Sequence, residues 1–147
     1  MIEVLSPEEI EVLLERSVVG RIGCYAEGRI YVVPVAYAYD AGCVYAHTAE
    51  GLKLRMMRKN PSVCFEVDTV ESVFNWRSVI AWGTFEELHG AAAEDAMRAI
   101  MLRFLQTKAQ PNSRTLSSQR PGIASDQAVV YRIRLIEKMG RFEHTQE

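Results

Sequence analysis

Hydrophobic and polar positions recur along the chain with two different periods. Near the N-terminus, Ile10, Leu13 and Leu14 follow helical spacing, with polar residues between them. The segment SPEE at 6–9 precedes them and supplies a capping box, with proline at the first helical position. The pattern therefore predicts a helix that begins after Ser6 and ends near Ser17.

From residue 18 to residue 68 the spacing is that of strands. Alternating apolar runs at 18–25 and 30–39 flank a turn at 26–29, and a turn at 40–42 leads into a third strand. Pro34 lies inside the second run, and because it has no N–H it belongs at an edge, a bulge or a break in pairing. A barrel that opens there would leave backbone groups free for a ligand.

The remaining pattern predicts a fourth strand at 62–67, a bent fifth strand at 73–87 with Gly83 at its bend, an amphipathic helix at 93–105 and a last strand at 128–137. The polar segment 108–127 lacks periodicity, which indicates either a lid or disorder. About six strands, largely joined by hairpins, with three helices favour a mainly β fold. We expect a small antiparallel β-barrel with flanking helices, forming a single domain over residues 1–147.

Composition narrows the classes of partner. The 17 basic and 19 acidic residues give a formal net charge of -2, so we expect no nucleic acid partner. The acidic N-terminus lacks a long apolar run, so we expect no signal peptide, membrane span or membrane partner. Cys24, Cys43 and Cys64 are widely spaced in apolar runs without a paired ligand. They predict no metal site and three reduced thiols in a cytoplasmic protein.

A short basic segment follows the predicted third strand. Lys53, Arg55, Arg58 and Lys59 all fall between residues 47 and 61. Either these cations form a solvated helix face, or some of them hold an anion. Thr48 can cap the helix. The free N–H groups at the start of a helix attract phosphate, and the positive charge of Lys53 would strengthen this attraction. The other three cations run away from the helix start and are expected to face solvent.

Ordered motifs add a family resemblance. They are the PV pair at 34–35, HTAEGLK at 47–53, KNPSVCFEVD at 59–68 and WRSV at 76–79. The run from Arg16 to Leu88 resembles the pyridoxamine-5′-phosphate-oxidase-like FMN-binding split barrels, and within them the nitroimidazole-resistance branch. The resemblance implies a six-stranded antiparallel split barrel. It also implies a homodimer with two FMN sites at the subunit interface.

The resemblance also implies a role for particular residues. Lys53 matches a phosphate-binding lysine of the family. The family's neighbouring arginine aligns with Leu52, so Arg55 is a candidate substitute. His47, at the strand end, would orient a substrate or pass a proton, which makes it the catalytic candidate. The remaining cofactor-binding candidates are Tyr31, Val32, Val33, Pro34, Val35 and Ala36 along the isoalloxazine ring, Thr48 beside His47, Ser78 on the fifth strand, and Trp76 and Arg77 from the partner chain.

The activity that the resemblance implies is that of an FMN-dependent oxidoreductase. Electrons would pass from a reduced nicotinamide to a small acceptor such as a nitroaromatic compound. No GxGxxG motif opens a helix, so the nicotinamide would bind transiently. The alternative is a non-catalytic protein of the same fold that binds flavin, haem or a deazaflavin. Pyridoxamine-phosphate oxidation is not expected, because the C-terminal segment lacks the family's substrate-phosphate arginines, and the sequence leaves the role of Arg141 open.

Overall fold

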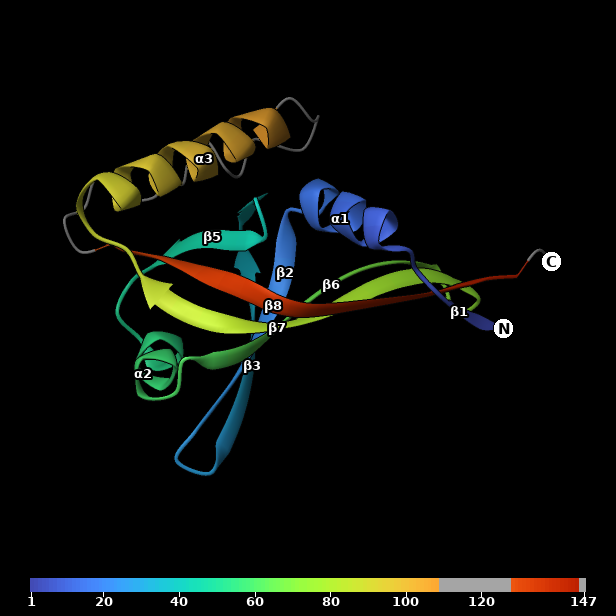
Figure 1. The fold of residues 1–147 in the computed structure, drawn as a ribbon, viewed down its shortest axis with the longest axis horizontal. Helices are drawn as coiled ribbons and strands as arrows, with labels where there is room; N and C mark the ends of the chain where they lie inside the picture. Colours follow the sequence, from blue (N-terminus) through green and yellow to red (C-terminus); the bar gives the residue numbers. More distant parts are fainter. Residues whose placement is uncertain (109–127, 146–147) are drawn as a thin grey trace.

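The computed structural model describes residues 1–108 and 128–145 (Figure 1). Its elements are, in chain order, β1 (Ile2–Val4), α1 (Pro7–Arg16), β2 (Val19–Ala26), β3 (Arg29–Ala36), β4 (Ala38–Asp40), β5 (Cys43–Thr48), α2 (Leu52–Lys59), β6 (Ser62–Ser72), β7 (Asn75–Glu87), α3 (Gly90–Lys108) and β8 (Val129–His144). The segment 108–127, expected to be a lid or disordered, lies outside the described residues apart from Lys108 at the end of α3.

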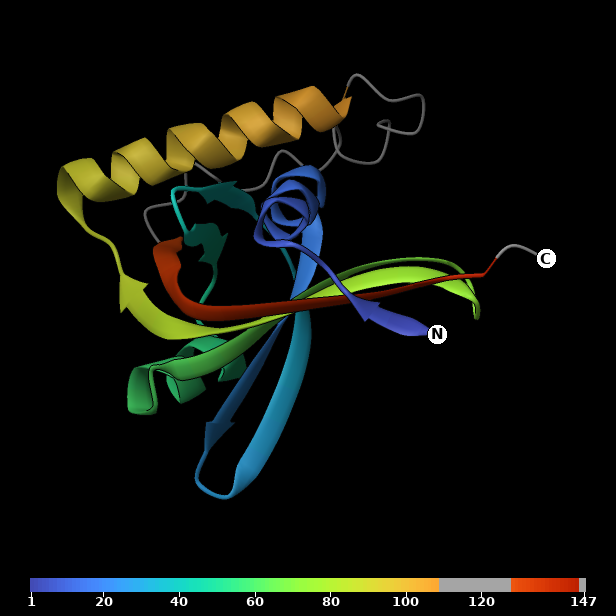
Figure 2. The same cartoon turned by 45° about the vertical axis from the view of Figure 1, so that its right-hand side comes forward.

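All eight strands of the described residues belong to one antiparallel sheet. The strand order is β3-β2-β6-β7-β8-β5-β4, and β1 pairs with β8. The end strands β3 and β4 do not pair with each other within the described part, so the coiled sheet stays open between them. Figures 1 and 2 show α1 and α3 above β5 and β8, with α2 beside the β2–β3 hairpin. The predicted mainly β split barrel is confirmed, with β1 and β4 as short strands that the pattern did not predict.

Two strands extend well beyond their predicted ends. β6 continues to Ser72 and β8 to His144, and together with β7 they form a long ribbon. Both faces of that ribbon carry polar or exposed residues near its tip, so the alternation on which the prediction rested fades there. Pairing with β7, rather than burial, keeps these residues extended.

Pro34 lies in β3, at one edge of the sheet, as expected. β2 and β3 are joined by a two-residue turn in which Glu27 and Gly28 both have positive φ, at 53° and 78°. Hydrogen-bonded and non-hydrogen-bonded pairs alternate from such a turn, which makes the pair of Arg21 and Pro34 a non-hydrogen-bonded one. The missing N–H of Pro34 therefore removes no hydrogen bond between β2 and β3, and the nitrogen of Pro34 faces the free edge.

The predicted continuous strand at 30–39 breaks at Tyr37. This residue is fully buried, and its hydroxyl donates to the carbonyl of Leu14 in α1 at 2.6 Å. Its ring meets Phe65 edge-on, with centroids 5.0 Å apart. Tyr37 thus ties α1 to the core at the point where the chain leaves one edge of the sheet for the other.

α1 matches its predicted boundaries, and α3 begins three residues before and ends three residues after the predicted helix at 93–105. The side chain of Ser6 accepts from the backbone of Glu9, and the Glu9 carboxylate accepts from the backbone of Ser6, which completes the capping box of α1. The hydrophobic residues on either side of this box, Leu5 and Ile10, are both buried. No helix in the described ranges combines the length and the apolar character that crossing a bilayer would need.

Gly83 marks an irregularity where β7 bends against β8. The register shifts between Trp82 and Gly83, and a Cβ at Gly83 would lie 2.4 Å from the carbonyl oxygen of Arg134. The expected bend is therefore present, and it depends on a residue without a side chain.

We predict that Gly83→Ala lowers the free energy of unfolding by about 1–3 kcal/mol, since either β7 or β8 must move to admit the methyl group. Urea unfolding followed by circular dichroism measures this. Gly23→Ala is the matched control, because its Cβ would meet its nearest neighbour, Cys64, at an ordinary 3.7 Å. Equal midpoints for the two variants would contradict the proposed constraint.

Candidate functional site

The candidate site is built where β5 gives way to α2. β5 ends at Thr48, which pairs with Val129 of β8, and α2 begins at Leu52, after three intervening residues. The predicted helix cap at Thr48 is wrong: its hydroxyl bonds the carbonyl of Ala49 at 3.0 Å, because a turn separates it from the helix. The N-cap is Gly51, which offers no side-chain acceptor.

The start of α2 is consequently short of negative charge. Its first turn contains no acidic residue, and no side chain caps its N–H groups. A Cβ built on Gly51 would have no atom of the described residues within 4 Å, so this part of the structure leaves the space beside the cap open. Free N–H groups at a helix start carry partial positive charge and favour an anion.

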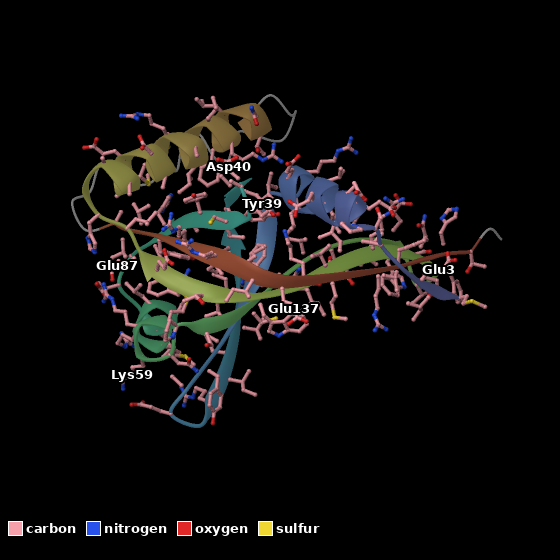
Figure 3. The ribbon with its side chains drawn as sticks, in the orientation of Figure 1. Glu3, Tyr39, Asp40, Lys59, Glu87 and Glu137 are labelled. Atoms are coloured by element: carbon pink, nitrogen blue, oxygen red, sulfur yellow. The ribbon has the colours of Figure 1, made fainter. Side chains whose placement is uncertain are left out.

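The four cations of the basic segment divide into two pairs. Arg58 is held by Glu50 at 3.0 Å and Glu87 at 2.8 Å, and Lys59 is held by Glu27. Figure 3 shows Glu87 beside α2, and Lys59 on the side of α2 nearest the β2–β3 turn. Within residues 1–108 and 128–145, Lys53 and Arg55 make no ion pair. Two charges are thus neutralised by the fold, and two remain available.

Lys53 is the more constrained of the two available cations. Its side chain is half-buried, and this burial lowers the pKa of its ammonium group, an effect that the nearby Cys24 partly offsets. Removing an ammonium group from water without a carboxylate partner is unfavourable in free energy, and a bound anion would offset this penalty. Lys53 is therefore the side chain of α2 best placed to hold an anion.

His47 lies close to Lys53 but faces α3. Its ring meets Phe104 edge-on at a centroid distance of 6.3 Å, and its buried Nε2 has no hydrogen-bond partner in the described part of the chain. Burial is the main cause that lowers the pKa of His47, and the Lys53 charge lowers it further. His47 is thus held neutral, with one ring nitrogen unsatisfied.

Tyr131 on β8 is a polar residue that sequence reasoning did not single out. It is fully buried, its hydroxyl has no partner among the described residues, and its burial raises the pKa of the phenol. Cys24, which interacts with Lys53, is also close enough to affect it. In the sequence, Tyr131 occupies an apolar position of an alternating strand. This pattern does not predict that its hydroxyl group lies in the core without a partner.

The six candidate residues of β3 lie on an edge strand paired only with β2. Tyr31 is paired with Cys24, and the Cys24 thiol donates to the Tyr31 carbonyl at 3.7 Å. Val35 is buried and Tyr31 and Val33 are half-buried, while Val32, Pro34 and Ala36 are exposed. The backbone groups at the free edge are accessible, as the predicted backbone contact with a ligand requires.

The candidates on β7 lie far from Lys53 within one chain. The register of β6 measures the separation. Cys24, which lies beside Lys53, follows Gly23, and Gly23 pairs with Cys64 of β6. Trp76 pairs with Val70, which is six residues further along the same strand. At about 3.3 Å per residue this separates them by roughly 20 Å. Trp76 is half-buried and donates to Glu143 at 3.3 Å, Arg77 is exposed, and Ser78 pairs with Arg141. One chain brings together His47, Thr48 and Lys53, but not Trp76, Arg77 or Ser78.

Comparisons with known proteins agree with this geometry. The family described as pyridoxamine 5′-phosphate oxidase matches residues 6–142. An FAD-binding protein of Mesorhizobium loti is 32% identical, with a TM-score of 0.71 over 97% of this chain and 98% of that one. A proposed 5-nitroimidazole antibiotic resistance protein of Bacteroides thetaiotaomicron has a TM-score of 0.74 at 21% identity, over 97% and 87% of the two chains.

A curated relative, an uncharacterized protein of Rhizobium meliloti (strain 1021), is 30% identical over 87 residues. The match covers 59% of this chain and 58% of that relative's length. The fold, an open antiparallel barrel with three helices in its described part, is that of the split-barrel class. The chain belongs to the pyridoxamine 5′-phosphate oxidase family.

We predict that Lys53→Met raises the pKa of His47 toward its ordinary value of 6.5, without reaching it, because burial is the larger cause of the shift. Histidine ring signals followed by NMR across a pH titration measure this. The lowered pKa also means that the folded state loses stability relative to the unfolded state as the pH falls below 6.5. An unchanged His47 midpoint in Lys53→Met would show that the two side chains do not interact.

Proposed function

We propose that this protein binds a flavin by its phosphate group at Lys53 and acts as a flavin-dependent oxidoreductase. The observation that carries the proposal is the half-buried Lys53, unpaired within the described residues, beside an uncapped helix start. FMN is the smallest flavin that carries the required phosphate. The 32% identical Mesorhizobium loti protein, which is named as FAD-binding, supports a flavin as the ligand.

The residues at this corner fit such a group. The ammonium of Lys53 and the first N–H groups of α2 would neutralise the phosphate, and Arg55 would add a second charge. The free edge of β3 from Tyr31 to Ala36 would run along the flavin ring and contact it through backbone groups. The Nε2 of His47, which has no hydrogen-bond partner among residues 1–108 and 128–145, is a further polar atom at this corner.

When bound, a flavin accepts a hydride or electrons from a donor and passes them to an acceptor. The chain's own contribution would be to hold the phosphate, to exclude water beneath α3 and to position His47. Because the pKa of His47 is lowered, the neutral imidazole predominates near pH 7 and can accept a hydrogen bond or a proton from a substrate. We propose a reduced nicotinamide as donor and a small molecule such as a nitroaromatic compound as acceptor.

The distance between Lys53 and Trp76 supports a homodimer. Since one chain keeps Lys53 and Trp76 roughly 20 Å apart, the Trp76 and Arg77 that complete a site would come from a second copy. The exposed hydrophobic side chains Val32, Ile80, Trp82 and Met139 on the sheet provide surface that such a contact would cover. The cytoplasmic location expected from the cysteines stays a prediction.

We predict that Lys53→Ala weakens flavin binding by about 1.5–3 kcal/mol, the value of a hydrogen bond to a charged group. Titration of flavin-free protein with FMN, followed by flavin fluorescence, measures the change. Arg58→Ala is the matched control: it removes a cation from the same helix, but one that Glu50 and Glu87 already neutralise. Unchanged affinity in Lys53→Ala would remove Lys53 from the site. Flavin binding without oxidation of a reduced nicotinamide would identify the non-catalytic alternative.

The shared site predicts that two defective chains complement each other. Lys53→Ala and Trp76→Ala homodimers should each retain little flavin. A mixed dimer contains one site with the native Lys53 of one chain and the native Trp76 of the other, so it should retain about half the wild-type flavin. Purification through two affinity tags followed by absorbance measures this ratio. A flavin-bound monomer in light scattering would contradict the shared site.

A further inference from the structure

Two carboxylates lie in the middle of the side of the sheet that carries exposed hydrophobic residues. Glu66 and Asp68 are two residues apart on β6, so both project to the same side. Glu66 pairs with Ile80 of β7, and Asp68 pairs with Ser78. Ile80 is one of the exposed hydrophobic side chains that a second copy would cover in the proposed homodimer. The sequence FEVD at 65–68 therefore places two acids within that contact.

A single cation serves both carboxylates. Nη1 of Arg21 on β2 lies 3.3 Å from Oε1 of Glu66 and 3.3 Å from Oδ2 of Asp68. One guanidinium nitrogen thus bridges two acids, and one negative charge stays uncompensated when both acids are ionised. The side chains of Glu66 and Asp68 are only 28% and 31% exposed, so water solvates this excess charge in part.

The other charged or titratable groups around Glu66 lie on β6 and β8. On β6, the thiol of Cys64 projects to the same side, and its pKa is raised by burial and, to a lesser degree, by the Glu66 charge. Opposite the acids, β7 presents neutral side chains. On β8, Glu137 and Arg141 flank this position at a distance of at least about 10 Å. α1 packs on the other side of the sheet, against Gly140.

These surroundings favour the protonated form of Glu66. Burial is the largest cause, followed by the hydrogen bond and the negative charge of Asp68, and together they raise the pKa of Glu66 from 4.5 to about 7. Arg21 opposes this shift without cancelling it. Glu66 thus changes its charge close to neutral pH, whereas an ordinary glutamate is fully ionised there.

We propose that two copies of the chain associate through this side of the sheet with the uptake of a proton from solvent at Glu66 of each copy. The inference rests on the homodimer of the proposed function and names what controls its formation. A two-fold contact covers the same surface on both copies, so both acid pairs leave water together. Protonation of Glu66 leaves one carboxylate, Asp68, against one guanidinium, Arg21, and this balanced pair is less unfavourable to cover.

Association through this contact depends on pH with a definite sign. Covering Glu66 raises its pKa further in the dimer than in the free chain, because the ionised form loses more of its water. The dissociation constant is therefore steady below about pH 7, where both states hold the proton. Above pH 7 it rises by up to about tenfold per pH unit for each proton that the dimer takes up.

Sedimentation of the full-length protein, fluorescently labelled and followed through a dilution series, measures the dissociation constant at pH 6 and pH 8. Wild type should bind its second copy at least about tenfold more weakly at pH 8. Glu66→Gln has the shape of the protonated acid and does not titrate, so it should associate at pH 8 as tightly as wild type does at pH 6. Glu94→Gln, which removes an exposed carboxylate from α3, is the matched control and should retain the wild-type pH dependence.

The other outcomes separate this inference from the proposed function. A flavin-binding dimer with equal dissociation constants at the two pH values would overturn the proton-linked contact and leave the proposed function intact. A pH dependence that persists unchanged in Glu66→Gln would do the same. A protein that stays monomeric at both pH values would overturn the shared flavin site together with this inference. Carboxyl-carbon NMR of glutamate-labelled protein follows Glu66 directly, and a titration midpoint at the ordinary 4.5 would also overturn it.

Discussion

The antiparallel pairing of β8 is the interaction on which the rest of the structure depends. β8 pairs with β7 over most of its length, and its other edge pairs with β5 and β1. The pairing of Thr48 with Val129 fixes the end of β5, and therefore the point from which the chain turns into α2. Closing these contacts joins residues far apart in the sequence, so the site near the middle of the chain exists only once the last strand is in place.

Some cations of α2 are paired with carboxylates and others are not, so one short helix combines stability with binding. Arg58 and Lys59 meet carboxylates and fasten the helix to β7 and to the β2–β3 turn. Lys53 is half-buried, and the described part of the chain gives it no such partner, which is unfavourable for the folded state on its own. Unpaired buried charge of this kind is typical of sites where stability is given up for recognition. The helix can carry this cost because its other side is packed through Leu54 and Met57, which are fully buried.

Much of this arrangement could be predicted from the sequence, for identifiable reasons. The capping box before α1, the proline of β3 and the glycine of β7 each have a local physical meaning, and each appears where it was expected. Thr48 shows where local reasoning fails: serine or threonine caps are common, but whether a helix starts directly after it depends on the turn that follows. The fold also brings together residues that are distant in sequence: Arg58 pairs with Glu87, and Arg29 and Arg55 line one cavity between α2 and the β2–β3 turn. Local sequence patterns contain no information about such long-range contacts.

Pro34 has a consequence for the behaviour of the molecule in a crowded solution. An unpaired sheet edge is a template onto which strands of other molecules can add, and this is a common first step in aggregation. The residues of β3 near Pro34 are apolar, and Val32 and Ala36 are exposed, which makes this edge a particular hazard. Because the nitrogen of Pro34 faces outward without a hydrogen, an incoming strand cannot complete its ladder there. The proline at the open edge of the barrel thus also protects the protein from adding unrelated chains.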